Sequence, residues 1–410
     1  MDVIGIVGEY DPFHYGHKHH ISETVKLLGK DLPVVCVMSG DFIQRGEAAV
    51  FSKFARAEAA VRCGVDLVIE LPVPWTLSSA EGFARGAVGL LGATGVVTHI
   101  SFGSECGETE PLCTLAETML APDFANDIKT QLALDDGIPF ALARQRAAAM
   151  RVGELASQLE LPNNILAVEY IKAIYGQRLD IEPVTVQRFG SGHDKTSAAG
   201  PKSASELRTA LASGISIKDS VPEKAFEVYL NEERLGRGPI LKENLETAMM
   251  SRLRMLPDAD FAALPDAGEG LNNRLCRACR EESGLDAVFA AAKSRRYALS
   301  RIRRMTMCAA LGIKAGDSDG IPPYIRVLAA SERGCSVLRE MSERASLPVI
   351  TKPASVKELS AECRRIFGIC SAAHDLYALG YCAREERKGG ADWRTSPKIV
   401  NKQPDEIKKY

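Results

Sequence analysis

Residues 3–17 read Val3-Ile4-Gly5-Ile6-Val7-Gly8-Glu9-Tyr10-Asp11-Pro12-Phe13-His14-Tyr15-Gly16-His17. The first six form a short apolar run, rich in β-branched residues, that predicts a buried strand. A loop follows, and residues 16–28 predict a helix directly after it. Strand, loop and helix together predict the first unit of an α/β fold, with the loop at the carboxyl end of the strand.

The same alternation continues to about residue 102. Apolar runs at 34–38, 67–71 and 96–102 predict three more strands, and residues 52–63 and 79–91 predict helices between them. Continuous apolar runs separated by helices indicate strands that are buried on both faces of a parallel sheet. The predicted fold class is therefore α/β, a Rossmann-like parallel sheet whose ligands lie outside the carboxyl ends of the strands.

The pattern changes after about residue 219. Helices are predicted at 242–256, 284–293, 298–311 and 354–379, and strand signals are few. Residues 384–410 are polar with scattered glycine and proline, which is typical of a weakly ordered tail. We expect an α/β domain over residues 1–215, a mainly helical region over 216–383 and a polar tail over 384–410.

Composition and charge exclude several classes of protein. The 410 residues are 46% apolar and 25% charged, with a net charge of −2, so a site for a polyanion must come from local clustering. No run of about 18 apolar residues occurs, which excludes a membrane-spanning helix. The first residues lack the basic start and apolar stretch of a signal peptide. We therefore expect a cytoplasmic protein.

The chain has 11 cysteines, which we expect to stay reduced in that compartment. One close pair, Cys276 and Cys279, lacks the second pair that a zinc finger needs. It lies beside Leu275 in a predicted helix, where cysteine packs as a small apolar residue. No metal site is predicted there.

The loop before the first helix has the residue types that bind a phosphate. Backbone N–H groups and the helix dipole favour an anion at a helix start, and Gly16 allows a ligand to approach the backbone. His14 and His17 are three residues apart, so both can face one point. Two imidazoles can donate hydrogen bonds to a phosphate whose charge moves in the transition state, as adenylyl transfer from ATP requires.

Two other interpretations of these histidines stay open. A histidine at this position can merely cap the helix or pack against it. A metal site made by His14, His17, His19 and His20 is the other interpretation. It is weakened because His19 and His20 point to different helix faces, and because no carboxylate stands at the spacing of an H-E-x-x-H motif.

Several blocks of sequence resemble the tRNA(Met) cytidine acetate ligase family, a branch of the HxGH nucleotidylyltransferase superfamily. Residues 9–17, with the His-x-Gly-His motif after the first strand, carry the resemblance first. The other blocks are 38–47 (Met-Ser-Gly-Asp-Phe-Ile-Gln-Arg-Gly-Glu), 66–72 (Asp-Leu-Val-Ile-Glu-Leu-Pro), 101–105 (Ser-Phe-Gly-Ser-Glu), 162–170 (Pro-Asn-Asn-Ile-Leu-Ala-Val-Glu-Tyr) and 269–275 (Glu-Gly-Leu-Asn-Asn-Arg-Leu). Long blocks in order are more specific than one short motif.

The resemblance implies a ligase that joins acetate to ATP, giving acetyl-adenylate and pyrophosphate. The acetyl group then passes to N4 of the wobble cytidine of elongator tRNA(Met), so the implied partners are ATP, acetate and the anticodon region of that tRNA. No protein partner is predicted. Mg²⁺ is expected with the ATP phosphates, although no dedicated carboxylate cage is visible.

The resemblance also implies site residues. The catalytic residues are His14 and His17. The implied ATP contacts are Val7, Gly8, Glu9, Tyr10, Asp11, Pro12, Phe13, His14, Tyr15, Gly16, His17, Lys18, His19, His20, Gly103, Asn163, Arg188 and Phe189.

Some of these residues have a simpler interpretation. Gly103 ends a predicted strand, so it can also be a turn glycine. Asn163 precedes a predicted helix, so it can also be an N-cap. Arg188 at a strand end can pair with phosphates, and Phe189 can pack on adenine or in the core.

Further cations and polar groups are candidates for phosphate binding. Residues 203–208 form a serine-containing helix start with Arg208, which resembles the second phosphate motif of the superfamily or is an ordinary surface helix. Gln44, Arg45, Lys53 and Arg56 follow the second strand, where they can hold pyrophosphate or RNA or only solvate a surface.

The chain departs from the family pattern at two positions of the loop. The family usually has Asn where this chain has Asp11 and Tyr15. Asp11 is a mild change, because both residues favour turns. Tyr15 is expected to put a bulky ring between the two histidines, which would leave their chemistry intact but alter the fit of the loop or access of substrate.

Residues 293–304 carry six cations and no acid. If the segment is one helix, Arg296, Arg303 and Arg304 lie near one stripe, where they can contact RNA phosphates and give affinity rather than sequence choice. Tyr297 can stack on an exposed base. A solvated basic surface is the alternative. With the resemblance, the expected RNA-binding residues are Arg296, Tyr297, Arg301 and Arg304.

Two other functions stay open. A small-molecule nucleotidylyltransferase would use the same loop but would not need the basic segment. A non-catalytic RNA- or nucleotide-binding protein would not need both histidines.

Overall fold

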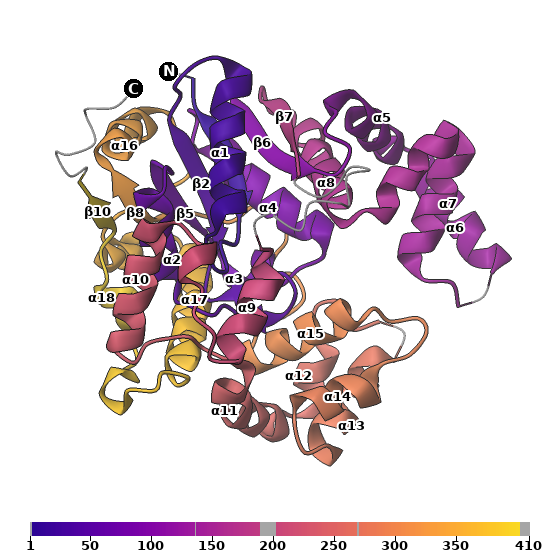
Figure 1. Cartoon of the computed structure of the whole chain (residues 1–410). Helices are drawn as coiled ribbons and strands as arrows, with labels where there is room; N and C mark the ends of the chain where they lie inside the picture. The colour runs from indigo at the N-terminus through magenta and orange to yellow at the C-terminus, as the bar shows by residue number, and fades with distance from the viewer. Residues whose placement is uncertain (1, 136, 189–201, 269, 402–410) are drawn as a thin grey trace.

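The computed structural model describes residues 2–135, 137–188, 202–268 and 270–401. In this part of the chain, a mixed sheet of eight strands has the order β10-β8-β5-β2-β1-β6-β7, with β9 beside β8 (Figure 1). The strands are β1 (Ile4–Gly8), β2 (Val34–Ser39), β5 (Leu67–Leu71), β6 (His99–Ser104), β7 (Glu182–Gln187), β8 (Ile325–Ser331), β9 (Val349–Ile350) and β10 (Lys398–Val400). A separate hairpin pairs β3 (Phe42–Ile43) with β4 (Glu47–Ala48).

The predicted α/β class and the first four predicted strands are confirmed. The expected all-parallel sheet is only partly correct, because β8 runs antiparallel to β5 while every other pair in this sheet is parallel. No strand was predicted at β8. Its fully buried sequence contains Ala329 and Ala330, and alanine has little preference for strands, so the segment resembles its helical surroundings.

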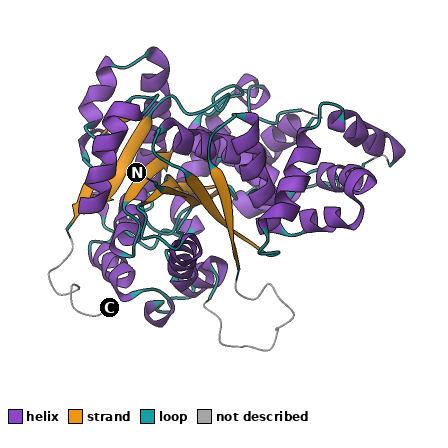
Figure 2. Cartoon of the chain, turned by 90° about the horizontal axis from the view of Figure 1, so that it is seen from above, coloured by secondary structure: helices purple, strands orange, loops and turns teal. Residues whose placement is uncertain are grey.

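Helices cover both faces of the sheet (Figure 2). Side chains alternate along each strand, so Ile6 and Cys36 pack with Ile21 in one core, while Val37 packs with Phe83 in the other. The helices of the first core are α1 (Tyr15–Leu28), α2 (Lys53–Arg62), α9 (Ala204–Ala212) and α10 (Glu223–Arg234). Those of the second include α3 (Val73–Thr76), α4 (Ala80–Ala93), α8 (Pro162–Gly176), α16 (Glu332–Arg344) and α17 (Ala361–Ala378).

Two groups of helices extend from this body (Figure 1). One projects as an arm and consists of α5 (Thr109–Leu120), α6 (Phe124–Leu134), α7 (Phe140–Val152) and η1 (Gly153–Glu160). The other lies below the sheet in this view and contains α11 (Lys242–Met255), α12 (Asp258–Ala262), α13 (Leu271–Glu281), α14 (Leu285–Ala292) and α15 (Leu299–Leu311). Both groups contribute to the second hydrophobic core, so they pack onto the sheet-bearing body.

The expected helix at 354–379 is two elements, η3 (Pro353–Glu358) and α17. Ser360 separates them, because its side chain accepts a hydrogen bond from the N–H of Cys363 and starts a new helix there (3.2 Å). The remaining short helices are η2 (Lys218–Ser220), η4 (Arg384–Glu386) and α18 (Ala391–Arg394).

The expected weakly ordered tail is wrong over residues 384–401. This segment contains η4, α18 and β10, and β10 adds to the edge of the main sheet beside β8. The polar composition of this segment predicted weak order, but Asp392 is fully buried in an ion pair with Lys53. The local sequence cannot reveal that distant partner. Residues 402–410 lie outside the described part of the chain. The other expected domain limits stay predictions, although strands β8, β9 and β10 show that the sheet extends beyond residue 215.

Cys276 and Cys279 are buried on α13, as expected of packing residues, and all 11 cysteines are free thiols. Among the described residues, no helix has the length and apolar character to cross a membrane.

Candidate active site

The histidine loop, residues 8–17, connects the carboxyl end of β1 to α1, in the middle of the sheet. Phe13 anchors this loop to the core, and its side chain is fully buried. The N–H of Phe13 donates to the hydroxyl of Tyr229 on α10 (2.8 Å), and the Tyr229 ring stacks on Phe51 (4.4 Å between centroids). The ring of Phe13 therefore packs in the core and its N–H is held by Tyr229, so its predicted contact with ATP would have to come from its carbonyl group.

Tyr10 also supports the loop from inside. Its φ of +48° is rare for a residue with a side chain, and its buried ring lies edge-on to Phe13 and His17, each at 4.9 Å. A Cβ atom on Gly8 would lie 3.1 Å from the Tyr10 ring, so glycine at that position gives the ring its space. Like Phe13, Tyr10 is placed to hold the shape of the loop.

His14 and His17 form a stacked pair at the start of α1. Their ring centroids are 3.7 Å apart, with an angle of 24° between the planes. Nδ1 of His14 accepts from the N–H of Gly16 (3.0 Å), and Nδ1 of His17 accepts from the N–H of His14 (3.2 Å). The two imidazoles thus form the reciprocal capping box that Ser and Glu form elsewhere. The capping interpretation is correct, but it uses only one nitrogen of each ring.

These two bonds fix the tautomer of each neutral ring. A ring nitrogen that accepts a hydrogen bond carries no proton, so in the neutral form the proton is on Nε2. Burial lowers the pKa of His14 to about 4, with a further contribution from the positive charge of Arg188. Burial lowers the pKa of His17 well below its usual value, and His14 and Arg188 add to this. Near neutral pH both rings are neutral and present Nε2–H donors.

Arg188 supplies a positive charge beside the histidine pair. Its N–H donates to the carbonyl of Ser104 at the end of β6 (2.9 Å), and its side chain is exposed. A Cβ atom on Gly103 would lie 3.1 Å from Cγ of Arg188, so glycine there leaves room for the arginine. Gly103 and Arg188 thus lie together near the histidines, and their contacts with ATP stay predictions. Phe189 lies outside the described residues.

The other loop histidines behave differently. Nε2 of His20 hydrogen-bonds to the hydroxyl of Ser101 on β6 (2.9 Å), which ties α1 to the sheet, and burial lowers the pKa of His20 to about 4. Among the described residues, no group of three or more His, Cys, Asp or Glu side chains is arranged to hold a metal ion. His19 is half-buried and Lys18 is exposed on the same helix.

Tyr15 does not lie between the two histidines, so that expectation is wrong. Its side chain is 43% exposed, while the rings of His14 and His17 are in direct contact. The first helical turn directs residue 15 away from the face that residues 14 and 17 share.

Asp11 links the histidine loop to two neighbouring segments. Its Oδ1 accepts from the N–H of Val50 (2.7 Å), and its carbonyl accepts from Nη1 of Arg208 on α9 (3.1 Å). The Asp11 and Arg208 side chains also form an ion pair at 3.8 Å. Burial raises the pKa of Asp11, which the nearby arginines oppose. The predicted second phosphate segment therefore lies directly against the loop, next to the buried Pro12.

Asn163 is not an N-cap, so that alternative is wrong. Leu161 occupies the cap position of α8, and the carboxylate of Glu105 takes over the capping. Its Oε1 accepts from the side-chain amide of Asn163 (2.6 Å), and its Oε2 accepts from the N–H of Asn164 (2.8 Å). A carboxylate at a helix N-terminus is stabilised by the helix dipole, and here it fixes the end of β6 beside α8.

Two of the four polar side chains that follow β2, those of Lys53 and Arg56, are used inside the protein. The guanidinium of Arg56 is fully buried and donates to the carbonyls of Glu9, Phe51, Ser39 and Gly40. The N–H of Gln44 donates to the carboxylate of Glu9 (2.7 Å). Lys53 is 1% exposed and fully paired, which leaves the exposed Arg45 as the cation placed to meet a ligand.

A buried charge cluster, which no local pattern indicated, lies under the hairpin β3–β4. Its members come from six elements or loops and are all nearly inaccessible: Asp41, Lys53, Glu70, Arg326, His374 and Asp392. Lys53 Nζ contacts Glu70 (2.8 Å) and Asp392 (2.7 Å), and Nη1 of Arg326 contacts the same two carboxylates at 2.9 Å each. Nδ1 of His374 contacts Asp41 at 2.8 Å.

The partners within the cluster favour the charged forms of Asp41 and His374. Burial opposes the charge on both, but Asp41 and its hydrogen bond raise the pKa of His374, and His374 and Lys53 hold the pKa of Asp41 well below its usual range. Three carboxylates face Lys53, Arg326 and His374, so a protonated histidine makes the charges balance. These residues join the sheet to α17 and α18 and have no visible role in binding ATP.

The basic segment 293–304 is a loop followed by α15, with Ala298 at the helix start, so the single helical stripe assumed from the sequence is absent. Tyr297 is 5% exposed and lies under the guanidinium of Arg301 (5.4 Å), so its expected stacking on a base is not possible in this conformation. Arg301 also donates to the carbonyl of Asp266 (2.9 Å), and burial lowers the pKa of Arg304. Roles for Arg296, Arg301 and Arg304 in RNA binding stay predictions.

A mostly parallel sheet with a histidine pair at the helix start after its first strand places this chain in a class of protein, the HIGH nucleotidyl transferases. The family model with that description, HIGH Nucleotidyl Transferase, matches residues 1–392.

Individual relatives narrow the assignment. The chain is 37% identical to the tRNA(Met) cytidine acetate ligase of Caldanaerobacter subterraneus subsp. tengcongensis, over 93% of this chain and 96% of that protein. It is 33% identical to that of Alkaliphilus metalliredigens, over 97% and 98%. A crystal structure of Thermotoga maritima TmcAL bound with alpha-thio ATP matches with a TM-score of 0.90 at 32% identity, over 98% of this chain and all of that chain. The chain belongs to the HIGH nucleotidyl transferases and, within them, to the tRNA(Met) cytidine acetate ligase family.

Proposed function

We propose that this protein is an ATP-dependent ligase that acetylates N4 of the wobble cytidine of elongator tRNA(Met). In the first step a carboxylate oxygen of acetate attacks the α-phosphorus of ATP, forming acetyl-adenylate and releasing pyrophosphate. In the second step the N4 amino group attacks the acetyl carbonyl carbon, AMP leaves and the amine loses a proton. The products are N4-acetylcytidine, AMP and pyrophosphate.

The observation that carries the proposal is the histidine pair. His14 and His17 each commit Nδ1 to a backbone N–H and keep Nε2–H for a ligand. Negative charge moves onto pyrophosphate as the bond to the α-phosphorus breaks, and preorganised donors stabilise that change without reorganising. Arg188 adds a positive charge near the same rings. No nucleophilic side chain is needed, because acetate itself attacks.

ATP binding is supported by the Thermotoga maritima relative, which was crystallised with an ATP analogue, and tRNA as substrate by the names of the relatives. Mg²⁺ is proposed to arrive with the ATP phosphates, since it is commonly held by substrate phosphates and one or two carboxylates rather than by a protein cage. We place the reaction in the cytoplasm, because 11 free thiols suit a reducing compartment.

Incubation with labelled acetate, ATP, Mg²⁺ and total bacterial tRNA tests the proposal directly. Nucleoside analysis should find label in N4-acetylcytidine, and omission of ATP should abolish it. Acetate-dependent pyrophosphate exchange without labelled RNA would leave adenylyl transfer standing but remove cytidine as the acceptor. Absence of both products, with ATP bound normally, would contradict the proposal.

A further inference from the structure

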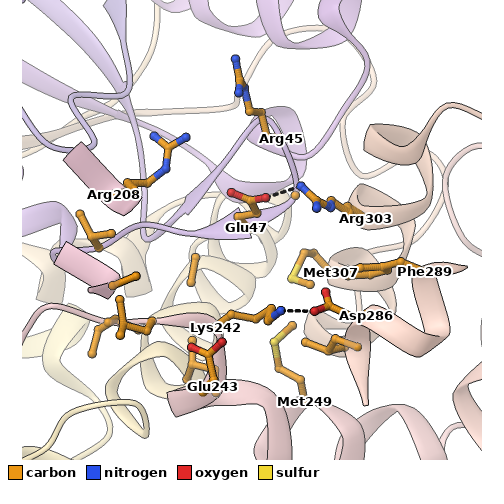
Figure 3. Close-up of a pocket in the computed structure, with 18 of the residues that line it drawn as sticks. Arg45, Glu47, Arg208, Lys242, Glu243, Met249, Asp286, Phe289, Arg303 and Met307 are labelled. Atoms are coloured by element: carbon orange, nitrogen blue, oxygen red, sulfur yellow. Dashed lines mark hydrogen bonds and ion pairs between the residues drawn. The ribbon is translucent and has the colours of Figure 1, made fainter. Parts of the chain in front are cut away.

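A cavity of about 500 Å³ lies between the sheet-bearing body and the lower helical group, next to the histidine loop. The hairpin β3–β4 and α9 line one side, and α11, α14 and α15 line the other (Figure 3). Its volume lies in the range of pockets that hold small organic groups, about 300–1,000 Å³. We call it the interdomain pocket.

The floor of the interdomain pocket is apolar. Met249, Phe289 and Met307 come from three helices of the lower group, α11, α14 and α15, and are each less than a tenth exposed. Val50, Ile240 and Leu245 complete the floor. Thioether and aromatic groups make broad contacts with a flat ring and require no particular hydrogen-bond pattern from it. This surface therefore favours a planar, weakly specified group over a small polar metabolite.

The charges around the pocket favour an anion attached to that group. Glu47 pairs with Arg303 and Asp286 pairs with Lys242, so two of the three lining acids are neutralised in place (Figure 3). The third, Glu243, lies in the first turn of α11, where the helix dipole stabilises it.

Two donors remain for a ligand. Arg45 is exposed at the tip of the hairpin and makes no ion pair with another described residue. The Nε–H of Arg303 is buried and has no acceptor among the described residues. One guanidinium at the mouth suits a phosphate, and one buried N–H suits an acceptor on a ring.

The pocket is adjacent both to the histidine loop, where ATP is proposed to react, and to the basic segment, where RNA is proposed to bind. Arg208 and Val50 line it, and both also contact Asp11 of the histidine loop. On the other side, the basic segment 293–298 runs directly from α14 to α15, which carry Phe289 and Met307. A chain of RNA phosphates that follows this segment would reach the mouth of the pocket, whereas a free nucleotide would gain nothing from the segment.

We propose that the interdomain pocket receives a second unpaired nucleotide of the RNA loop that carries the reactive cytidine. The base lies against Met249, Phe289 and Met307, and its phosphate meets Arg45. The pocket then fixes the register of the loop, so that the neighbouring cytidine reaches the histidine site. This inference rests on the proposed function and adds a specificity site to it.

A pocket-filling variant tests the inference. Ala212 and Thr209 line the pocket from the exposed face of α9, so Ala212→Trp and Thr209→Trp fill its space with little risk to the core. Ser342→Trp, on the exposed face of α16, is the matched control. The probe is the anticodon stem-loop of elongator tRNA(Met), with an abasic site introduced at each loop position in turn, and the measurements are its Kd and its KM for acetylation.

Loss of one stacked base corresponds to about a tenfold change in affinity. Both tryptophan variants on α9 should raise Kd and KM for the stem-loop by about this factor with a smaller change in kcat, and the control should match the wild type. One abasic position should weaken binding to the wild type yet make no further difference to Ala212→Trp. Arg45→Ala should lower the slope of log Kd against log salt by about one.

Two results would overturn the inference. One is unchanged RNA affinity in both pocket-filling variants, provided that their melting temperatures match the wild type. The other is a penalty from the abasic sites that adds in full to that of Ala212→Trp at every position. Either result, obtained with an enzyme that acetylates the stem-loop, would exclude the pocket as a nucleotide-binding site and leave the proposed function intact. A wild-type enzyme that does not acetylate the RNA overturns both.

Discussion

The histidine loop and the buried charge cluster both hold histidines away from water, yet they shift the pKa values of these side chains in opposite directions. Nδ1 of His374 contacts the carboxylate of Asp41, which raises its pKa. Nδ1 of His14 and of His17 meets only a backbone N–H, and burial lowers both pKa values. The partner of one ring nitrogen thus decides whether a buried histidine is a fixed cation or a neutral donor.

The difference explains what each region can do. The buried charge cluster pairs three carboxylates with three basic side chains inside the core. The histidine loop offers two ring N–H donors at a helix start, and we propose that the phosphates of ATP meet them there. We therefore expect the cluster to stabilise the fold and the histidine loop to serve the proposed reaction.

The largest effect should come from removing the imidazoles while keeping the cap. Asn is a good N-cap and Gln fits the third helical position of a capping box, so His14→Asn and His17→Gln preserve the hydrogen bonds to the backbone. Each variant should lose about 10²–10⁴-fold in kcat for acetylation, with a small change in melting temperature. Full activity in either variant would show that capping is the only role of that histidine.

A substitution in the buried charge cluster should lower the stability of the folded protein. Lys53→Met removes one cation and leaves Glu70 and Asp392 with a single shared partner, so the free energy of unfolding should fall by about 3–5 kcal/mol. Lys398→Met breaks an exposed ion pair with Glu58 and should cost less than about 1 kcal/mol in the same urea titration. Equal losses in the two variants would contradict the structural role of the cluster.

A fall in pH should change the contributions of the loop histidines and of His374 to the free energy of unfolding in opposite directions. The unfolded chain binds a proton at each loop histidine below pH 6.5, but folded His14 binds one only near pH 4. Unfolding should therefore become easier as pH falls from 6.5 to 4, by up to about 3 kcal/mol for this residue. His374 acts in the opposite sense, because its stabilisation is complete below pH 6.5 and is lost as pH rises through its raised pKa.

Thermal denaturation as a function of pH checks this prediction. His14→Asn should have a shallower loss of melting temperature than the wild type between pH 6.5 and 4. The raised pKa values of Glu9 and Asp11 act in the other direction near the acid end, but they are common to both proteins. Parallel curves would mean that His14 already binds a proton in the native state.

The smallest effect should come from Tyr15→Asn, which restores the residue usual in the family. Because the Tyr15 side chain is 43% exposed, its replacement should change stability by less than about 0.5 kcal/mol and activity by about twofold or less. A large gain in affinity for ATP would show that Tyr15 limits the access of ATP to the histidine loop.

The sequence was informative where function depends on neighbours in the chain. The strand, loop and helix around His14 and His17 could be predicted because spacing along one helical turn sets their geometry. The buried charge cluster could not, because Lys53 and Asp392 meet only in the folded chain. Strand β10 and the burial of Tyr297 were missed for the same reason: polar segments acquire partners that composition does not show. The proposed ATP and RNA contacts remain predictions.

The most direct test is the protonation state of the three imidazoles, measured by ¹⁵N NMR of histidine-labelled protein at pH 7, before and after addition of ATP and Mg²⁺. We expect neutral rings protonated at Nε2 for His14 and His17 and a charged ring for His374. ATP should shift the Nε2 signals of the loop pair and leave those of His374 in place. Charged loop histidines in the free protein, or loop signals that ATP does not move, would contradict the account.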